Sequence, residues 1–282
     1  MLQTSMQYEY DKKQALAETI HASELHRQKV IRNAVSAGLA LLLLFSGIVY
    51  RKRNRVRKEK HRAESERKKS DALLLNILPE EVAGELKEKG HADARLFDRV
   101  TVMFTDFKGF THISEKLTPS ELVAEIHTCF KAFDEIISNH NIEKIKTIGD
   151  AYMCAGGLPV SNSTNAIDVV KAAIDIQQFM KRHLEERKFS GKEIFEIRIG
   201  IHTGPVVAGI VGVKKFAYDI WGDTVNIASR MESSGESGKI NISGSTYELV
   251  KDQFKCAYRG KILAKNKGEI DMYFVEGVGV TV

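Results

Sequence analysis

The chain has 282 residues, of which 43% are hydrophobic and 28% are charged, and its formal net charge is +5. This length fits one good-sized folded domain with additional segments and leaves little room for two full domains. Residues 51–70 contain eleven Lys or Arg residues against three Glu residues, so the rest of the chain is slightly acidic. Because the basic excess forms one block outside the expected folded part, we do not expect a nucleic-acid-binding protein.

Residues 1–32 are polar, favour helix, contain no Pro or Gly and are too short to fold alone. They resemble the membrane-proximal stem of bacterial sensor proteins that carry helical repeats outside the membrane. By that resemblance they form an extracytoplasmic helical stem, and the chain is a piece of a longer receptor whose N-terminal sensor is missing from it.

An uncharged, apolar segment covers residues 33–50 and includes the run Leu39-Ala-Leu-Leu-Leu-Leu-Phe45. As a helix it would cover about 27 Å of a hydrocarbon core that is roughly 30 Å thick, so it predicts one transmembrane helix. A signal peptide is the alternative. We disfavour it because more than thirty residues, acids among them, precede the run, which is too long for such a peptide and has no small-residue cleavage site after it.

The charges beside this segment predict its orientation. Six of the residues 51–58 are Lys or Arg, whereas only Arg27, Lys29 and Arg32 precede the segment closely. By the positive-inside rule, the residues after the span are cytoplasmic. Three cysteines lie far apart after the span: Cys129, Cys154 and Cys256. They form no C-x-x-C pair and are expected as reduced thiols, which agrees with this location.

Residues 51–90 predict a helical signalling linker. Residues 51–76 contain no Gly or Pro. Four residues recur every seven positions: Val56, Ala63, Ser70 and Ile77. A short parallel coiled coil and a single solvated helix both fit this pattern, since Ala63 and Ser70 would make a poor seam.

A second linker helix is expected after Pro79, because Pro suits the start of a helix, with two Glu residues in its first turn and Gly90 as its stop. Its apolar face is expected to contain Leu75, Leu78, Val82 and Leu86. The whole linker is expected to transmit a signal from the membrane to the folded part.

Residues 91–282 predict an α+β domain. A β-branched, apolar strand at 99–105 ends at Asp106, and residues 118–121 form a capping box that begins a helix of about five turns. Further elements are expected in this order: a strand at 143–148, a turn at Gly149-Asp150, a strand at 151–155, a helix at 165–187, a strand at 195–201, and strands near 240–243, 254–260 and 271–276. The order β-α-β-β-α-β is typical of a ferredoxin-like antiparallel sheet with helices.

Two features near the fourth strand are expected to be structural. Residues 204–209 superficially resemble a phosphate-binding P-loop, but Ile210 stands where Lys is required, so we expect an ordinary loop. His202 has no acid or Ser beside it in the sequence, and we expect it to be structural.

Three sequence blocks carry the chemistry. They are Phe104-Thr-Asp-Phe-Lys-Gly-Phe-Thr111, Lys144-Ile-Lys-Thr-Ile-Gly-Asp-Ala-Tyr-Met153 and Tyr218-Asp-Ile-Trp-Gly-Asp-Thr-Val-Asn-Ile-Ala-Ser-Arg-Met-Glu232. They resemble the three signature blocks of class III adenylyl and guanylyl cyclases, in order and with similar spacing, over residues 73–276. The resemblance implies the class III cyclase catalytic fold and an adenylate cyclase that converts ATP into 3′,5′-cyclic AMP and pyrophosphate in cyclic-nucleotide signalling.

The reaction requires the ribose 3′-hydroxyl to attack the α-phosphorus in line while pyrophosphate leaves. Two divalent ions activate the hydroxyl and hold the phosphates. The resemblance implies two Mg²⁺ ions per site, with Mn²⁺ as a substitute, held by Asp106, Asp150 and the backbone carbonyl of Phe107. For a lone Asp150 after Gly149, turn chemistry is the alternative.

Two further segments are expected to receive phosphate groups. The chain around Gly109-Phe110-Thr111 enters a short helix whose free backbone amides suit phosphate oxygens. Lys265 matches a phosphate-binding lysine of the family's last loop. Because Asn266 stands where the family usually has Gly, Lys267 remains the alternative.

Lys146 and Asp219 stand at the family's two base-specifying positions, where guanylyl cyclases typically carry Glu and Cys or a similar residue. Adenine offers an acceptor at N1 and a donor amine at N6, so a Lys donor and an Asp acceptor suit it, whereas guanine reverses both demands. The alternative for Lys146 is a solvent-facing strand residue, since Lys144 alternates with it.

Asn226 and Arg230 lie four residues apart in a helix expected to begin near residue 223, hence on one face. They correspond to the family's transition-state pair: Asn226 orients the ribose and Arg230 neutralises charge on the α-phosphate. A salt bridge with Glu232 or another acid is the alternative for Arg230.

In this family the metal carboxylates come from one subunit and the base-specifying and transition-state residues from the other. This chain carries both sets, so the resemblance implies a homodimer with two identical sites at the interface and an inactive monomer. It also implies a bacterial inner-membrane protein, anchored by one transmembrane helix, with a cytoplasmic catalytic domain.

Three other functions were weighed. A guanylate cyclase is disfavoured by Lys146 and Asp219. A diguanylate cyclase needs a Gly-Gly-Asp/Glu-Glu-Phe turn, whereas this chain has Ile148-Gly-Asp-Ala-Tyr152. A catalytically silent, dimeric cyclase-like signalling module usually lacks a metal Asp or the transition-state Arg, and this sequence has both.

Overall fold

The computed structural model describes residues 2–189, 195–212, 214, 216–264 and 268–279, with backbone only for residues 2–7 and 264. The chain divides into two compact units, Met1–Ala72 and Leu73–Val282. Lys265 and Lys267, the two candidate phosphate-binding lysines, lie outside the described residues.

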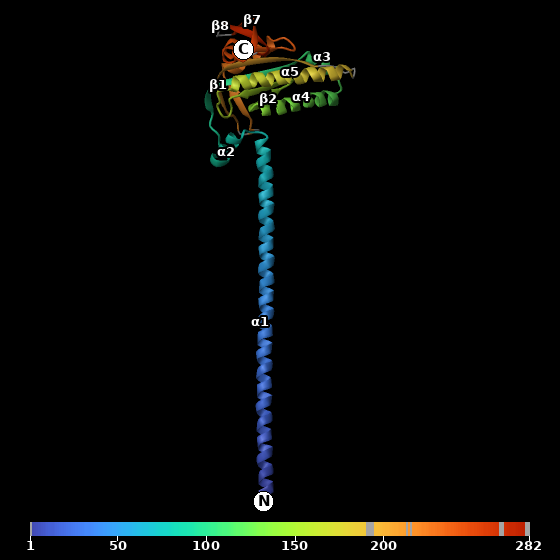
Figure 1. The fold of residues 1–282 in the computed structure, drawn as a ribbon, viewed down its shortest axis with the longest axis vertical. Coiled ribbons are helices and arrows are strands. Elements are labelled where there is room, and N and C mark those ends of the chain that lie inside the picture. The colour runs from blue at the N-terminus through green and yellow to red at the C-terminus, as the bar shows by residue number, and fades with distance from the viewer. Residues whose placement is uncertain (1, 190–194, 213, 215, 265–267, 280–282) are drawn as a thin grey trace. The chain divides into compact units, whose positions relative to one another are not determined.

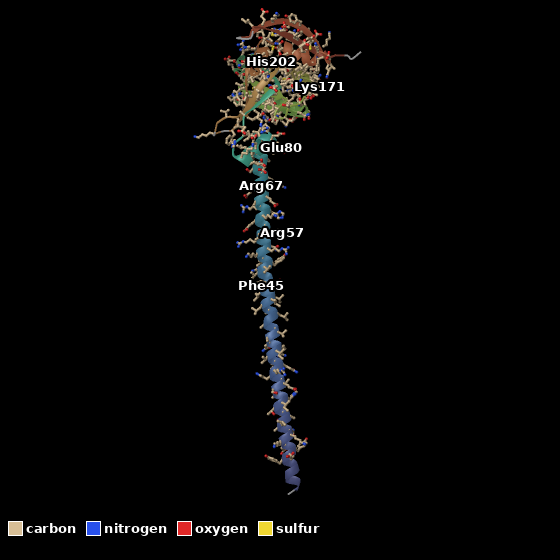
Figure 2. All side chains as sticks on the ribbon, turned by 90° about the vertical axis from the view of Figure 1, so that its left-hand side faces the viewer. Phe45, Arg57, Arg67, Glu80, Lys171 and His202 are labelled. Atoms are coloured by element: carbon tan, nitrogen blue, oxygen red, sulfur yellow. The ribbon has the colours of Figure 1, made fainter. Side chains whose placement is uncertain are left out.

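Helix α1 (Leu2–Leu75) makes up the first unit and continues to the start of the second. The expected stem, span and first part of the linker form one uninterrupted helix, because no Pro occurs in it. Figure 2 shows side chains projecting all round it, with Phe45 in the apolar segment and Arg57 and Arg67 in the basic one. An 18-residue window with a mean hydropathy of 1.8 has no buried residues, so by length and composition α1 can span a membrane.

Helix α2 (Glu80–Lys89) confirms the predicted second linker helix. It starts after Pro79 and ends at Gly90, whose φ of 77° is left-handed and whose N–H donates to the Leu86 carbonyl. Ile77 lies in the turn that follows α1, so the seven-residue repeat leaves the helix after Ser70.

The apolar face predicted for this helix needs one correction. Leu78 is buried, and Val82 and Leu86 pack on the core as expected, but Leu75 is 47% exposed and Leu74 takes its place. A turn separates α1 from α2, and a helical repeat does not keep its phase across such a break.

Within its described residues, the second unit is built on a mixed sheet of eight strands. The strands are β1 (Arg95–Lys108), β2 (Ile142–Ile148), β3 (Ala151–Gly156), β4 (Glu196–Ile210), β5 (Tyr218–Trp221), β6 (Ile240–Ser243), β7 (Phe254–Ala264) and β8 (Gly268–Val278). Their order is β2-β3-β1-β4-β6-β8-β7, with β5 paired to β4. The predicted fold class is confirmed: all pairs are antiparallel except β4 with β6, which is parallel.

Helices cover both faces of this sheet. They are α3 (Phe110–Ser114), α4 (Pro119–Asn139), α5 (Asn165–Phe189), α6 (Asp223–Ser233) and α7 (Gly244–Val250). In Figure 1, α4 and α5 lie side by side along the sheet, and their apolar residues share one core with Met103 and Phe107 of β1. The neighbouring residues Val102 and Phe104 point into a second core with α2 and α6. Burial on both faces explains why Val102, Met103 and Phe104 at the centre of β1 are consecutive apolar residues.

Local sequence signals predicted the start of α4 correctly, but the predicted end of the fourth strand was wrong. The Thr118 capping box is present, with the Thr118 hydroxyl and the Glu121 carboxylate bonded to each other's backbone N–H. The expected loop at 204–209 was wrong, because these residues continue β4 to Ile210. Pro205 is tolerated there since it falls at an irregularity of the β1–β4 ladder.

His202 lies in a buried hydroxyl network. Its Nδ1 is 2.7 Å from the Ser243 hydroxyl and 3.2 Å from the Ser245 hydroxyl, so the fold brings to it Ser residues that are distant in the sequence. Burial lowers the pKa of His202 to about 4, which keeps the ring neutral near pH 7. These contacts support a structural role.

Candidate active site

Asp106 and Asp150 come together where β1 and β3 meet. The β1–β3 register pairs Thr105 with Tyr152, which places Asp106 beside the start of β3, and Asp150 is in the turn just before it. Gly149 has a φ of 63°, which permits that tight turn. Partial burial and the charge of Asp106 both raise the pKa of Asp150. Two half-buried carboxylates held together in this way suit a hard divalent cation, which would offset their repulsion.

Arg198 on β4 is a charged neighbour that the sequence reasoning missed. It pairs with Asp106 in the β1–β4 register, and its Nη2 donates to Asp106 Oδ1 at 3.0 Å. Its Nε lies 2.9 Å from Glu232 Oε1, an ion pair that is close but not aligned as a hydrogen bond. The only signal in the sequence was a basic residue in the fourth predicted strand. The pairing of that strand with β1, which places Arg198 against Asp106, is seen only in the structure.

Glu232 at the end of α6 is buried next to this group. Burial and then the charge of Asp106 raise its pKa to about 7, while Arg198 opposes the shift. Helix α6 can approach so closely because Gly200 has no side chain: a Cβ there would lie 1.9 Å from the Glu232 backbone nitrogen. Helix α6 therefore packs directly on β4, and its Glu232 lies beside the Asp106 carboxylate.

The expected phosphate segment lies directly after Asp106. Gly109 has a φ of 68° and precedes α3, which contains Phe110 and the exposed Thr111. The Phe107 ring is buried against other aromatic rings, with Phe130 at 5.9 Å and Phe195 at 5.0 Å between ring centroids. The ring anchors the segment, so only the Phe107 backbone is available to a ligand.

Lys146 and Asp219 face each other from β2 and β5. Lys146 Nζ donates to Asp219 Oδ2 at 2.6 Å, and Asp219 Oδ1 accepts from the Ile220 N–H at 2.8 Å. Lys144, which alternates with Lys146, instead pairs with Asp134. Two residues that are 73 positions apart in the sequence are thus brought together as one donor and acceptor pair.

Asn226 and Arg230 lie on α6, four residues apart as predicted. Asn226 is exposed, and Arg230 Nη1 donates to the Leu263 carbonyl of β7 at 3.1 Å. The alternative of an Arg230–Glu232 salt bridge is not seen, since Glu232 pairs with Arg198. Arg230 therefore lies beside the strand that leads to residues 265–267.

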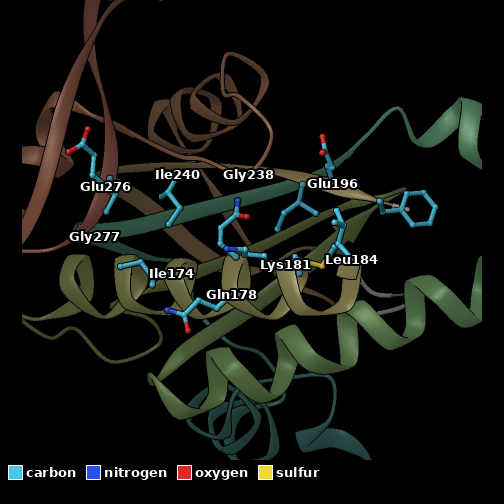
Figure 3. A pocket seen from close by; sticks show the side chains of 14 residues that line it. Ile174, Gln178, Lys181, Leu184, Glu196, Gly238, Ile240, Glu276 and Gly277 are labelled. Carbon is cyan, nitrogen blue, oxygen red and sulfur yellow. The ribbon is translucent and has the colours of Figure 1, made fainter. Parts of the chain in front are cut away.

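A separate pocket of about 330 Å³ lies between α5 and strands β4, β6 and β8 (Figure 3). Its floor is apolar, with Ile174 and Ile240, and its rim carries Lys181, Glu196 and Glu276. The described candidate site residues do not line it, so the size of this pocket does not identify the active site.

Comparison with known proteins shows the family. The family described as "Adenylate and Guanylate cyclase catalytic domain" matches residues 92–277, and the chain belongs to it. The chain is 44% identical over 218 residues to guanylyl cyclase C of Sus scrofa, covering 76% of this chain and 20% of that protein. It is 38% identical over 215 residues to an adenylate cyclase of Mycobacterium tuberculosis, covering 76% of this chain and 48% of that protein. The chain thus spans about a fifth of the length of the guanylyl cyclase and about half of the length of the adenylate cyclase.

A solved structure of similar fold is the catalytic core of a rhodopsin-guanylyl cyclase with converted specificity, in complex with ATPαS. It has a TM-score of 0.60 and 36% identity, and the match covers 66% of this chain and 98% of that one. The second unit is therefore a class III cyclase catalytic domain, a class of enzyme that uses divalent metal ions.

Proposed function

We propose that the chain is an adenylate cyclase that converts ATP into 3′,5′-cyclic AMP and pyrophosphate. The observation that carries this proposal is the Lys146–Asp219 pair, one cationic donor and one anionic acceptor that meet at 2.6 Å. Adenine needs one donor for N1 and one acceptor for N6, whereas guanine would face a donor and an acceptor in the wrong places.

The relatives named as guanylyl cyclases favour a second candidate, cyclic GMP formation, because their identity is higher. Overall identity reports the whole domain, however, whereas the base is read by a few side chains. The guanylyl cyclase core with converted specificity, in complex with ATPαS, is an example of this fold with an ATP analogue bound. We therefore give the base-facing pair more weight.

In the proposed mechanism Asp106, Asp150 and the Phe107 carbonyl would hold Mg²⁺ ions. Once bound, these ions would supply Lewis-acid activation of the 3′-hydroxyl and charge neutralisation of the phosphates. Mn²⁺ is the expected substitute. The 3′-oxygen forms a bond to the α-phosphorus, the bond to pyrophosphate breaks, and the hydroxyl proton leaves to solvent.

The remaining residues bind and orient the substrate. Asn226 positions the ribose, and the fixed charge of Arg230 stabilises negative charge that develops on the α-phosphate. Gly109-Phe110-Thr111 and Lys265, or Lys267 in its place, receive the other phosphate oxygens. Each site draws on both subunits of a homodimer, because one chain contains both residue sets.

We further propose how the chain is arranged. Residues 33–50 cross a bacterial inner membrane once, residues 1–32 form a stem outside it, and residues 51–90 connect the span to a cytoplasmic catalytic domain at 91–282. The basic residues 51–58 support this orientation.

The test is product formation by the detergent-solubilised chain, with ATP or GTP and with Mg²⁺ or Mn²⁺. We expect cyclic AMP from the parent and a loss of at least about 100-fold in Asp106→Ala. Asp98→Ala, an exposed Asp on the same strand, is the matched control and should keep parental activity. No product from the parent with either nucleotide and either metal would contradict the proposal and favour a silent signalling module.

A further inference from the structure

A second group of potential metal ligands lies between α4 and α5. Glu125 and Cys129 are four residues apart on α4, so their side chains share a face, and His183 reaches them from α5. The ligand atoms of all three residues lie within 4.8 Å of one another. This group shares no residue with the Asp106 and Asp150 site.

Neighbouring residues already orient two of the three ligands. The His183 ring stacks on Phe179, with 5.6 Å between centroids and 10° between planes, and its Nε2 is 2.6 Å from Glu125 Oε1. Arg187 Nη2 is 3.1 Å from the other oxygen, Glu125 Oε2. Outer partners that fix a ring and hold the second carboxylate oxygen are typical of metal sites.

Burial favours a tightly held ion over a loose surface one. Cys129 is fully buried, and the side chains of Glu125 and His183 are only 7% and 16% exposed. An entering dication would displace the thiol proton of Cys129 to solvent, so a thiolate and a carboxylate would meet its two charges. Arg187 would remain on the outer oxygen of Glu125.

The types of donor atom indicate which metal would bind. One sulfur, one imidazole nitrogen and one carboxylate oxygen suit Zn²⁺ and similar transition metals, whereas Mg²⁺ prefers oxygen alone. An oxygen and a nitrogen ligand bonded at roughly 2.0 Å in a tetrahedron lie about 3.3 Å apart, so the 2.6 Å contact between Glu125 and His183 has to open by about 0.7 Å. A water molecule would complete the set.

We propose that Glu125, Cys129 and His183 form a binding site for one Zn²⁺-type dication that joins α4 to α5. This inference is independent of the proposed cyclase reaction, since the two sites use different residues and prefer different metals. His140, the residue that follows α4, makes a similar His–carboxylate contact with Asp175 of α5, at 2.8 Å.

The experiment titrates Co²⁺, a spectroscopic substitute for Zn²⁺, into the tag-free, detergent-solubilised full chain in excess Mg²⁺. A sulfur ligand gives a near-ultraviolet thiolate-to-cobalt band that the carboxylate site of Asp106 and Asp150 cannot give. We expect one Co²⁺ per chain, displacement by Zn²⁺, and an unchanged band in Asp106→Ala.

Variants then assign the ligands. Cys129→Ser should abolish the band, and His183→Gln should weaken binding at least about tenfold. Cys256→Ser and His140→Gln are matched controls and should bind like the parent. A missing band in the parent, or a band that persists in Cys129→Ser, would overturn the proposal and leave an ion-pair cluster of Glu125, His183 and Arg187.

A melting measurement keeps the test decisive if Cys129→Ser does not fold. Zn²⁺ at a hundredfold excess over its Kd should raise the Tm of the parent by roughly 5 °C, because the ion binds only the folded state. The same Zn²⁺ concentration should raise the Tm of His183→Gln by at most about half as much, because the site binds at least about tenfold more weakly. Equal rises in both proteins would contradict the site.

Discussion

Asp106 and Arg198 are paired across the β1–β4 ladder, and the guanidinium lies 3.0 Å from the carboxylate. The same guanidinium reaches Glu232, on the helix that also carries Asn226 and Arg230. One Arg therefore connects the proposed metal aspartate to the proposed transition-state helix of the same chain. In a homodimer with shared sites, these two parts would serve different active sites.

The first prediction concerns this connection. Arg198→Met leaves Asp106 and the buried Glu232 without their shared cation, so it should lower the free energy of unfolding by about 1–3 kcal/mol. Breaking a buried pair costs more, but the Arg198 and Asp106 side chains are 28% and 24% exposed. Urea unfolding of the detergent-solubilised chain measures the change. Adding Glu232→Gln should recover part of the loss, and strictly additive effects of the two substitutions would show that the pair is not coupled.

The second prediction tests the shared sites. Asp106→Ala and Arg230→Ala should each be inactive, because each damages both sites of its own homodimer. Unfolded together and refolded as an equal mixture, they should regain about a quarter of parental activity, since half of the dimers are mixed and each mixed dimer has one intact site. Steady-state cyclic nucleotide production measures this recovery. A mixture as inactive as its components would exclude sites shared between subunits.

The third prediction concerns base choice. Lys146→Glu with Asp219→Cys exchanges the donor and acceptor for the residue types typical of guanylyl cyclases. The kcat/KM ratio of ATP to GTP should fall by at least about 100-fold, because the pocket then suits guanine. Lys144→Glu makes the same Lys-to-Glu substitution at the alternating position of β2 and should leave the kcat/KM ratio of ATP to GTP unchanged. An equal fall in both proteins would indicate a general charge effect.

The fourth prediction is a pH dependence of stability at Glu143 on β2. Burial, and then the charge of Glu81, raise its pKa from 4.5 to about 7. Between pH 4.5 and 7 the folded state holds a proton on Glu143 that the unfolded state has lost. The stability that comes from burying the neutral carboxyl group is therefore present at low pH and lost as the pH rises through 7, where the buried carboxylate becomes an energetic penalty. Glu143→Gln removes the penalty.

The gain in free energy of unfolding from Glu143→Gln should therefore grow from pH 5 to pH 8, reaching about 1–2 kcal/mol once the partly exposed position is allowed for. Urea unfolding at both pH values measures it. Glu135→Gln, an exposed Glu on α4, is the control. A gain that is the same at both pH values would contradict the raised pKa.

Features set by neighbours in the sequence could be predicted. Pro79 and Gly90 mark the ends of α2, and Thr118 begins α4 through its capping box. Each signal acts within one turn of chain, so no tertiary information is needed. Lys146 and Asp219 were named together from the family blocks, but the contact between them is seen only in the structure.

Features set by strand pairing could not be read from local sequence. Arg198 looked like an ordinary polar residue of an alternating strand, and only the β1–β4 register places it against Asp106. Glu232 was offered as a partner for Arg230, yet the packing of α6 on Gly200 turns it to Arg198. Strand β5 and helix α7 were not predicted, because both are short. Strand β5 forms by pairing with the extension of β4, which was also not predicted.

The central claim is that this cyclase domain acts on ATP. The most direct test is kcat/KM for ATP and for GTP, measured on the detergent-solubilised parent chain with saturating Mg²⁺ and then Mn²⁺, with cyclic AMP and cyclic GMP quantified separately. We predict a preference for ATP of at least about 100-fold, because guanine would set its N1–H donor against the Lys146 donor and its O6 acceptor against the Asp219 acceptor. Equal use of both nucleotides, or a preference for GTP, would contradict the assignment.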